Sequence, residues 1–268
     1  MDNLLLAFLF TLFAGLATGI GSVLAFFTKT TNTKFLSFAL GLSAGVMIYV
    51  SMVDIFFKAQ DALIADVGDP LGKWLTVGSF FAGISLIALI DRFIPMDSNP
   101  HEVKKIEDMK QPGTAIQDPA LMKMGVFTAM AIGIHNFPEG IATFISTLQD
   151  PTIGLAIAIA VAIHNIPEGI AVSVPVYYAT NDKKKAFKLS FFSGIAEPAG
   201  ALVAFFILMP FLTEMMFGII FAMVAGIMIF ISLDELLPAA KRYDETHVSI
   251  YGVITGMAVM AVSLLLLG

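Results

Sequence analysis

Residues Ile134–Ala142 read Ile-His-Asn-Phe-Pro-Glu-Gly-Ile-Ala, and the pattern returns at Ile163–Ala171 with one Phe-to-Ile exchange. Each copy lies near the middle of a long apolar segment and places a His and a Glu four positions apart, on one helical face. No Lys or Arg occurs between residues 124 and 182 to neutralise the acids. A carboxylate in hydrocarbon without a partner costs several kcal/mol. The repeat therefore predicts a visiting cation, and a metal ion is the cation that imidazole and carboxylate bind together.

The composition is that of an integral membrane protein. Hydrophobic residues make up 57% of the chain and charged residues 13%, and the mean hydropathy is +0.87. These values exclude an ordinary soluble domain. The chain has no Cys, which excludes disulfides and thiolate metal ligands. Met1–Asn3 contains no basic residue, so the apolar run that follows is expected to be a transmembrane helix and not a cleaved signal.

The hydrophobic pattern predicts an all-α integral membrane protein. About 20 apolar residues cross a bilayer core of about 30 Å, and such segments must be helices because an open strand edge is left unpaired in lipid. We expect one transmembrane domain over residues 1–268, with eight helices of which the fourth and fifth are kinked. The expected helices are Leu4–Phe27, Phe35–Phe57, Trp74–Asp91, Ala120–Thr147, Thr152–Ala179, Ala186–Phe211, Met215–Ala240 and Val248–Leu267.

The basic residues predict the orientation of these helices. With the N-terminus outside, thirteen of the fifteen Lys and Arg residues lie in connections on the cytoplasmic side, and only Lys58 and Lys73 lie opposite. This asymmetry predicts that both termini lie on the extracytoplasmic side of the cell (plasma or inner) membrane. The long polar connection Ile94–Pro119 is expected to be a mobile cytoplasmic loop. Its His101 could bind metal weakly, although a solvated tether is favoured.

The two motifs enter the fourth and fifth helices in opposite directions, because consecutive spanning helices run antiparallel. Transporters often hold their substrate at such a repeat interface near the midplane, on broken helices. Pro138 and Pro167, one in each motif, cannot donate to the carbonyl group four residues earlier, so a kink is expected in each helix. A further Glu-Pro pair, Glu197-Pro198, lies near the middle of the sixth segment.

These motifs place three carboxylates, two imidazoles and two amides at a similar depth, enough to hold one or two divalent ions. A mixed nitrogen and oxygen set without sulfur suits Zn²⁺, and also Fe²⁺, Mn²⁺, Co²⁺ or Cd²⁺. The ion is expected as cargo and not as a cofactor, the lipid bilayer is the expected environment, and no nucleic acid is expected as a partner. The candidate ligands are His135, Asn136, Glu139, His164, Asn165, Glu168 and Glu197.

Other polar residues within the apolar segments allow two interpretations each. Thr143 and Ser146 continue the face of Glu139, and either support a ligand or bond to backbone carbonyls. Four further acids either line a route to or from the metal or pair with basic residues at the membrane interface. These acids are Asp54, Asp91, Asp234 and Glu235, and their respective basic neighbours are Lys58, Arg92, Lys241 and Arg242.

The paired His-Asn-x-Pro-Glu-Gly motifs, with Glu197-Pro198, make the chain resemble the ZIP family of divalent metal transporters, above all its bacterial ZupT-like or GufA-like branch. The resemblance covers essentially the whole chain. It implies metal movement into the cytoplasm, a homodimer, and an elevator-like motion of the first, fourth, fifth and sixth helices against the others. It also implies a binuclear site, with one ion on His135, Glu139, His164, Glu168 and Glu197, and a second on Asn136 and Asn165 with Glu139 and Glu168 as bridges.

The chain departs from some relatives within this pattern. Some carry Gln and Asp where this chain has His164 and Asn165, which leaves the ion selectivity open. The long loop has one His and not a His-rich tract, which argues against metal sensing by the loop.

The function expected from these features is import of Zn²⁺ and related ions, with no enzymatic activity. An intramembrane di-metal enzyme of the hydrolase type is the alternative, but neither Glu-x-x-His nor His-Glu-x-x-His occurs in the chain. A haem cytochrome with His135 and His164 as axial ligands is disfavoured by the nearby carboxylates. Little in the sequence indicates transport of an organic solute.

Overall fold

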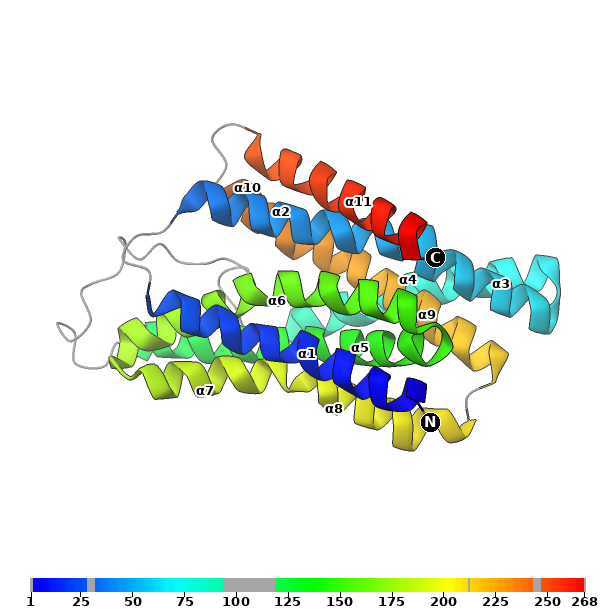
Figure 1. Cartoon of the computed structure of the whole chain (residues 1–268), viewed down its shortest axis with the longest axis horizontal. Helices are drawn as coiled ribbons and strands as arrows, with labels where there is room; N and C mark the ends of the chain where they lie inside the picture. Colours follow the sequence, from blue (N-terminus) through cyan, green and yellow to red (C-terminus); the bar gives the residue numbers. More distant parts are fainter. Residues whose placement is uncertain (1, 28–31, 94–118, 212, 243–246, 268) are drawn as a thin grey trace.

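The computed structural model describes residues 2–27, 32–93, 119–211, 213–242 and 247–267, and the statements that follow concern these residues. They form eight long helical segments and no strand, which confirms the predicted all-α fold. The segments lie side by side along the long axis of the molecule (Figure 1). They are α1 (Asp2–Ala25); α2 (Thr33–Val50) with η1 (Ser51–Ile55) and α3 (Phe56–Val67); α4 (Asp69–Phe93); α5 (Pro119–Gln149); α6 (Pro151–Thr180); α7 (Lys183–Gly194) with α8 (Ala196–Val203), η3 (Ala204–Leu208) and η4 (Met209–Phe211); α9 (Glu214–Phe230) with η5 (Ile231–Leu236) and α10 (Leu237–Arg242); and α11 (Val248–Leu267).

Seven of these segments are long and apolar enough to cross a membrane. The eighth, α5, is 31 residues long and carries the first motif. The predicted boundaries need two corrections. The second segment continues to Val67, beyond the predicted Phe57, and α4 begins at Asp69, before the predicted Trp74. The predicted loop, with His101, lies outside the described residues except for Pro119, which opens α5.

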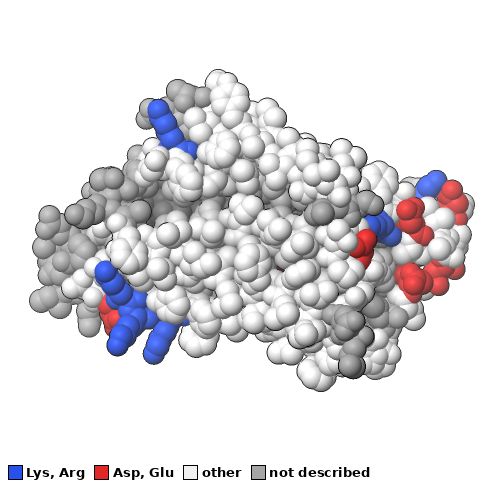
Figure 2. All heavy atoms as spheres, in the orientation of Figure 1, with Lys and Arg blue, Asp and Glu red and all other residues white. Residues whose placement is uncertain are grey.

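The extra length of α3 and α4 makes a helical hairpin that projects from one end of the molecule (Figure 1). Gly68 makes the turn, with a φ of 88° that residues with a Cβ rarely adopt. The exposed acids Asp61, Asp66 and Asp69 lie on this hairpin. In Figure 2, acidic side chains gather there, and basic ones gather at the opposite end, where α7 begins.

The helices form two groups. In the first group, α1, α5, α6, α7 and α8 pack against one another. In the second group, α2 packs along α11, and α9 packs along α3 and α4. Contacts between the groups are sparser and run mainly from α2 and α11 to α6. The first group contains every element that carries a candidate metal ligand, and this grouping matches the division of helices that the family resemblance implies.

Glycines allow close helix contact inside each group. A Cβ on Gly140 of α5 would overlap the backbone carbonyl of Glu197 on α8, and one on Gly169 of α6 would overlap the carbonyl of Thr18 on α1. Hydroxyls add to this packing, since Ser22 of α1 and Ser190 of α7 both donate to the carbonyl oxygen of Gly169, at 3.4 Å and 3.3 Å. Small residues and interhelical hydrogen bonds are the usual means of helix association in lipid. The backbone around Glu168 is thereby fixed from two neighbouring helices.

The α4–α9 contact gives a matched pair of glycines for a test of this packing. A Cβ on Gly83 would overlap the carbonyl oxygen of Met223 on α9, whereas a Cβ on Gly78, also in α4, would meet nothing within 4 Å. We expect Gly83→Ala to destabilise the protein by about 1–3 kcal/mol through overpacking. Gly78→Ala should leave stability unchanged or slightly raised. Thermal unfolding midpoints in detergent measure the difference, and equal midpoints for the two variants would contradict the packing described here.

Asp150, the single residue between α5 and α6, caps the second helix. Its carboxylate accepts hydrogen bonds from the backbone N–H groups of Thr152 and Ile153, at 2.8 Å and 3.4 Å. The bond from the Thr152 backbone is the main cause that holds the pKa of the Asp150 carboxyl below its usual value. A lowered pKa stabilises the folded state at pH values above the pKa of the unfolded chain, and this contribution is lost as the pH falls through the folded-state pKa.

Two substitutions separate the cap from the charge of Asp150. Asp150→Ala should lower the free energy of unfolding by about 1 kcal/mol at neutral pH, because the cap is lost. Asp150→Asn keeps an oxygen acceptor and should retain most of the stability, without the acid-dependent part. Unfolding midpoints measured from neutral to acidic pH test both expectations. The cap has no role if Asp150→Ala matches the parent at neutral pH.

Candidate metal centre

The two motifs face each other on α5 and α6 inside the first helix group. Both helices continue without interruption through the motif prolines, Pro138 and Pro167. At the third Glu-Pro pair, a turn at Ile195 separates α7 from α8 and places Glu197 in the first turn of α8. All seven candidate ligands are buried, with at most 2% of any of them exposed.

Three of the candidate ligands meet at His164. Its Nε2 lies 3.2 Å from Oε2 of Glu139, on α5, and 3.7 Å from Oε1 of Glu168, one turn further along α6. One imidazole therefore lies against a carboxylate from each motif. This imidazole and these two carboxylates are a donor set that Zn²⁺ accepts.

Glu197 reaches the same region from α8 through Asn165. The amide nitrogen of Asn165 donates a hydrogen bond to Oε1 of Glu197 and another, of 2.8 Å, to the carbonyl oxygen of Ala14 on α1. Oδ1 of Asn165 and Oε2 of Glu197 are both buried and accept no hydrogen bond from the described residues. Two buried oxygens with free lone pairs are what a hard or borderline cation needs as ligands.

Asn136 contacts the same group from α5. With its amide turned so that the nitrogen faces acceptors, Asn136 donates to Oε2 of Glu168 and to the carbonyl oxygen of Ile132, both at 3.2 Å. Its carbonyl oxygen is then oriented away from these two acceptors. Direct contacts thus join Asn136, Glu139, His164 and Glu168. Asn165 and Glu197 form a neighbouring pair, and the Glu197 carboxylate lies close enough to Glu139 and Glu168 to interact with their charges.

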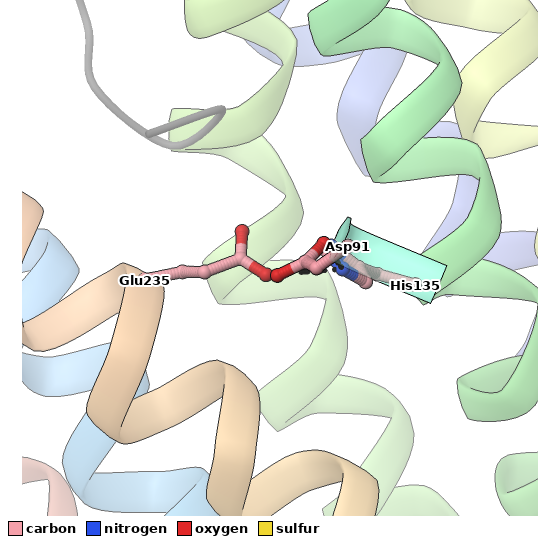
Figure 3. A group of neighbouring side chains, drawn as sticks. All are labelled: Asp91, His135 and Glu235. Carbon is pink, nitrogen blue, oxygen red and sulfur yellow. Dashed lines mark ion pairs between the residues drawn. The ribbon is translucent and has the colours of Figure 1, made fainter. Parts of the chain in front are cut away.

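The seventh candidate, His135, lies in a second group. Its Nε2 is 3.1 Å from Oε1 of Glu235, on η5, and 3.9 Å from Oδ1 of Asp91, on α4. Ligand atoms of these three residues all lie within 4.8 Å of one another. Figure 3 shows the three side chains pointing toward one another. His135 and Glu235 are buried and Asp91 is partly exposed, so this group also has the composition and spacing of a metal site.

The sequence alone left the roles of Asp91 and Glu235 open, and the structure places both at His135. The available signal was the depth of Glu235 inside an apolar segment, where an acid is rare and usually functional. Asp54 behaves differently, since its Oδ1 pairs with Nζ of Lys58 at 3.1 Å, as the interface interpretation predicts. Thr143 and Ser146 lie beyond Glu139 on α5 with buried hydroxyls that bond to none of the described residues.

The two groups lie next to each other along α5. Glu139 belongs to the first group and His135 to the second, and four residues of helix separate them by about 6 Å along the axis. The residues around His164 all come from the first helix group. The residues around His135 join α5 of the first helix group to α4 and η5 of the second. The structure therefore supplies two neighbouring sets of candidate metal ligands, and the second one bridges the two helix groups.

Comparison with known proteins gives a consistent result. A family profile described as "ZIP Zinc transporter" matches residues 95–264. A protein named "Zinc transporter ZupT" from Oceanobacillus iheyensis is 78% identical over 267 residues, which cover 100% of both chains. Proteins of the same name from Lysinibacillus sphaericus and Clostridium perfringens are 70% and 56% identical and cover 99% of this chain, with 98% and 97% of their own lengths matched.

The expected resemblance is thereby confirmed over the full length of the chain, and nothing in these matches supports the enzyme alternative. Long apolar helices and a set of metal ligands among them agree with the same assignment. The chain belongs to the ZIP family of zinc transporters, as a ZupT-like, multi-pass membrane protein that is a transporter and not an enzyme.

Proposed function

We propose that this protein imports Zn²⁺, and related divalent ions, into the cytoplasm through the ligands on α5, α6 and α8. The observation that carries the proposal is the burial of Glu139, Glu168 and Glu197 in one region, where the described contacts join them to His164 and Asn165. The zinc transporters of high identity support Zn²⁺ as the cargo. A divalent ion offsets the negative charge that the surrounding lipid disfavours.

Two ions can share this site. Glu139 and Glu168 both lie within 4 Å of His164 Nε2, and each carboxylate has a second oxygen with which to bridge. One ion would take His164 and Glu197 with Glu139 and Glu168, and the other would take the oxygens of Asn136 and Asn165 with Glu139 and Glu168 as bridges. The free lone pairs on Glu197 Oε2 support the first position, and those on Asn165 Oδ1 support the second. His135 joins the first ion in this proposal only if its side chain turns from Glu235 toward Glu139.

We propose that Asp91, His135 and Glu235 form a second ion-binding site on the cytoplasmic side of the first, called the inner station below. On α5, His135 precedes Glu139, and α5 follows a connection that carries Lys104, Lys105 and Lys110. On α4, Asp91 directly precedes Arg92 at the same end. The positive-inside asymmetry supports the cytoplasm as this side. An ion released from Glu139 would therefore meet Asp91, His135 and Glu235 on its way inward.

Movement of the first helix group against the second would open the site alternately to the two sides. The sparse contacts between the groups support such a motion. Release also needs weak binding, since a bound ion has to leave, and protonation of a carboxylate or an imidazole would weaken the ion's hold. We also propose residence in the cell membrane with both termini outside, a single transmembrane domain, and a homodimer.

Uptake of radioactive zinc by cells that lack their own zinc importers tests the proposed transport. Glu139→Ala and Glu168→Ala should each lower the initial rate about tenfold or more, because a ligand that both ions share is lost. Asp66→Ala, which removes an exposed acid on α3, is the control and should transport like the parent. Transport by the Glu139 and Glu168 variants at the parent's rate sinks the proposal.

Neighbouring acids on η5 test the inner station separately. Glu235→Gln removes the buried charge beside His135, whereas Asp234→Asn makes the same change at an exposed position. We expect Glu235→Gln to slow uptake while zinc binding to the purified protein persists, because Glu139, Glu168 and Glu197 remain. Asp234→Asn should change neither quantity. Calorimetric zinc titration alongside the uptake assay makes the distinction, and normal uptake by Glu235→Gln would remove the inner station from the route.

A further inference from the structure

A cavity of about 540 Å³ lies between the two helix groups, and none of the candidate metal ligands lines it. Its walls come from α4, α5, α9 and η3, and they consist only of Leu, Ile, Val, Met, Phe, Pro and Gly residues. Leu86 lies on α4, Phe137 and Pro138 on α5, and Met223 and Ile227 on α9. The volume falls within the range of about 300–1,000 Å³ that is usual for sites enclosing a small ligand.

The cavity and the candidate metal ligands share helix α5. The cavity is lined by Ile134, Phe137 and Ile141 of this helix, whereas His135 and Glu139 belong to the two sets of candidate ligands. Because α5 belongs to the first helix group and α4 and α9 belong to the second, the cavity occupies part of the boundary along which the groups would move. Whatever fills it therefore contacts both groups.

The cavity opens to the lipid-facing surface. Leu86 lines it and is nevertheless 42% exposed. Close to its walls, Leu89 of α4 and Met130 of α5 are exposed, as are Phe206 and Ile207 beside Leu208 of η3. These elements cross the membrane, so the opening faces hydrocarbon. Water is a poor occupant, because an ordered water needs two to four polar partners and the walls supply apolar side chains.

Two exposed basic residues on the lining helices favour an anionic lipid as the occupant. Arg92 follows the lining residue Ile90 by two positions at the end of α4, and Lys123 lies near the start of α5; both side chains are exposed. Six residues of helix place Leu86 about 9 Å from Arg92, and one leaflet supplies about 15 Å of hydrocarbon. A phosphate near Arg92 and Lys123 therefore leaves its acyl chain long enough to reach the cavity.

We propose that an acyl chain of an anionic phospholipid from the leaflet on the Arg92 side occupies this cavity. The headgroup phosphate lies near Arg92 and Lys123, and the chain passes Leu86 to lie between α5 and α9. The chain fills a space that protein side chains leave open, and it gives α5 a deformable hydrocarbon surface in place of a fixed protein contact. The lipid is thus a partner at the boundary between the helix groups.

A photoreactive phosphatidylglycerol with a diazirine on its acyl chain tests the position of the chain. The purified full-length protein is reconstituted in phosphatidylcholine vesicles containing this probe, irradiated, and mapped by peptide mass spectrometry. We expect labels on residues 134–141 of α5 and 220–227 of α9. Labels confined to outward-facing positions such as Ile254 and Val262 of α11 would overturn the proposal.

Two leucines on α4 provide the matched comparison. Leu86→Trp places an indole at the cavity wall, whereas Leu89→Trp makes the same change at an exposed position that does not line the cavity. Leu86→Trp should reduce labelling of both target segments several-fold, and Leu89→Trp should not. Met223→Trp fills the cavity from the opposite wall and serves if Leu86→Trp fails to fold. Equal labelling in the cavity-filling and control variants would also overturn the proposal.

The headgroup is tested with a second probe. A phosphatidylcholine carrying the same photoreactive chain should label the two segments less than the phosphatidylglycerol probe. Replacement of both Arg92 and Lys123 by Gln should lower phosphatidylglycerol labelling to the phosphatidylcholine level. Equal labelling of the parent protein by both probes would overturn the proposed anionic headgroup. Phosphatidylglycerol labelling that is strong in the parent and falls in the double variant would support it.

Discussion

The structure depends on the electrostatic cost of buried carboxylates. Glu139, Glu168, Glu197 and Glu235 are each at most 2% exposed, and the contacts described above join their carboxylates to His135, His164 and Asn165. An isolated charge in such surroundings is strongly destabilising. In the proposed sites the cost is offset by exchangeable partners, either a proton on an imidazole or a divalent ion among the carboxylates. This constraint explains why the acids come from separate helices and why an imidazole accompanies each group.

Close helix packing supplies the rigidity that such a site needs. Gly140 lets α5 approach the backbone of Glu197, and Gly169 lets α6 approach α1. Ser22 and Ser190 then bond to the carbonyl of Gly169, next to Glu168. Between the helix groups the contacts are fewer, and an apolar cavity occupies part of the boundary. Strong packing within a group and weak packing between groups favour motion of whole groups over deformation of the ligand set.

The sequence predicts the fold well because hydrocarbon permits few alternatives. Eight apolar segments in lipid have to be helices, and the structure confirms the all-α fold with small changes at the ends of the second and third segments. The sequence also identifies acids at mid-membrane, but it cannot give the rotation of each helix about its axis. That rotation follows from glycine contacts on other faces, and it turns His135 toward Glu235 and Asp91. Sequence analysis allows the same two interpretations for Asp54 and Glu235, yet the structure pairs Asp54 with Lys58 and buries Glu235 against the His135 imidazole.

The short connection between α5 and α6 has a mechanical consequence. Asp150 alone separates the last residue of α5 from the first residue of α6, and it is held by its own bonds to Thr152 and Ile153. With so short a connection, α5 and α6 cannot separate at their far ends without breaking the contacts along their length. The proposed ion site between α5 and α6 would therefore keep nearly constant dimensions, and access from either side would depend on movement of the other helices past this pair. Such a site would select ions by size and ligand preference in the same way on both sides of the membrane.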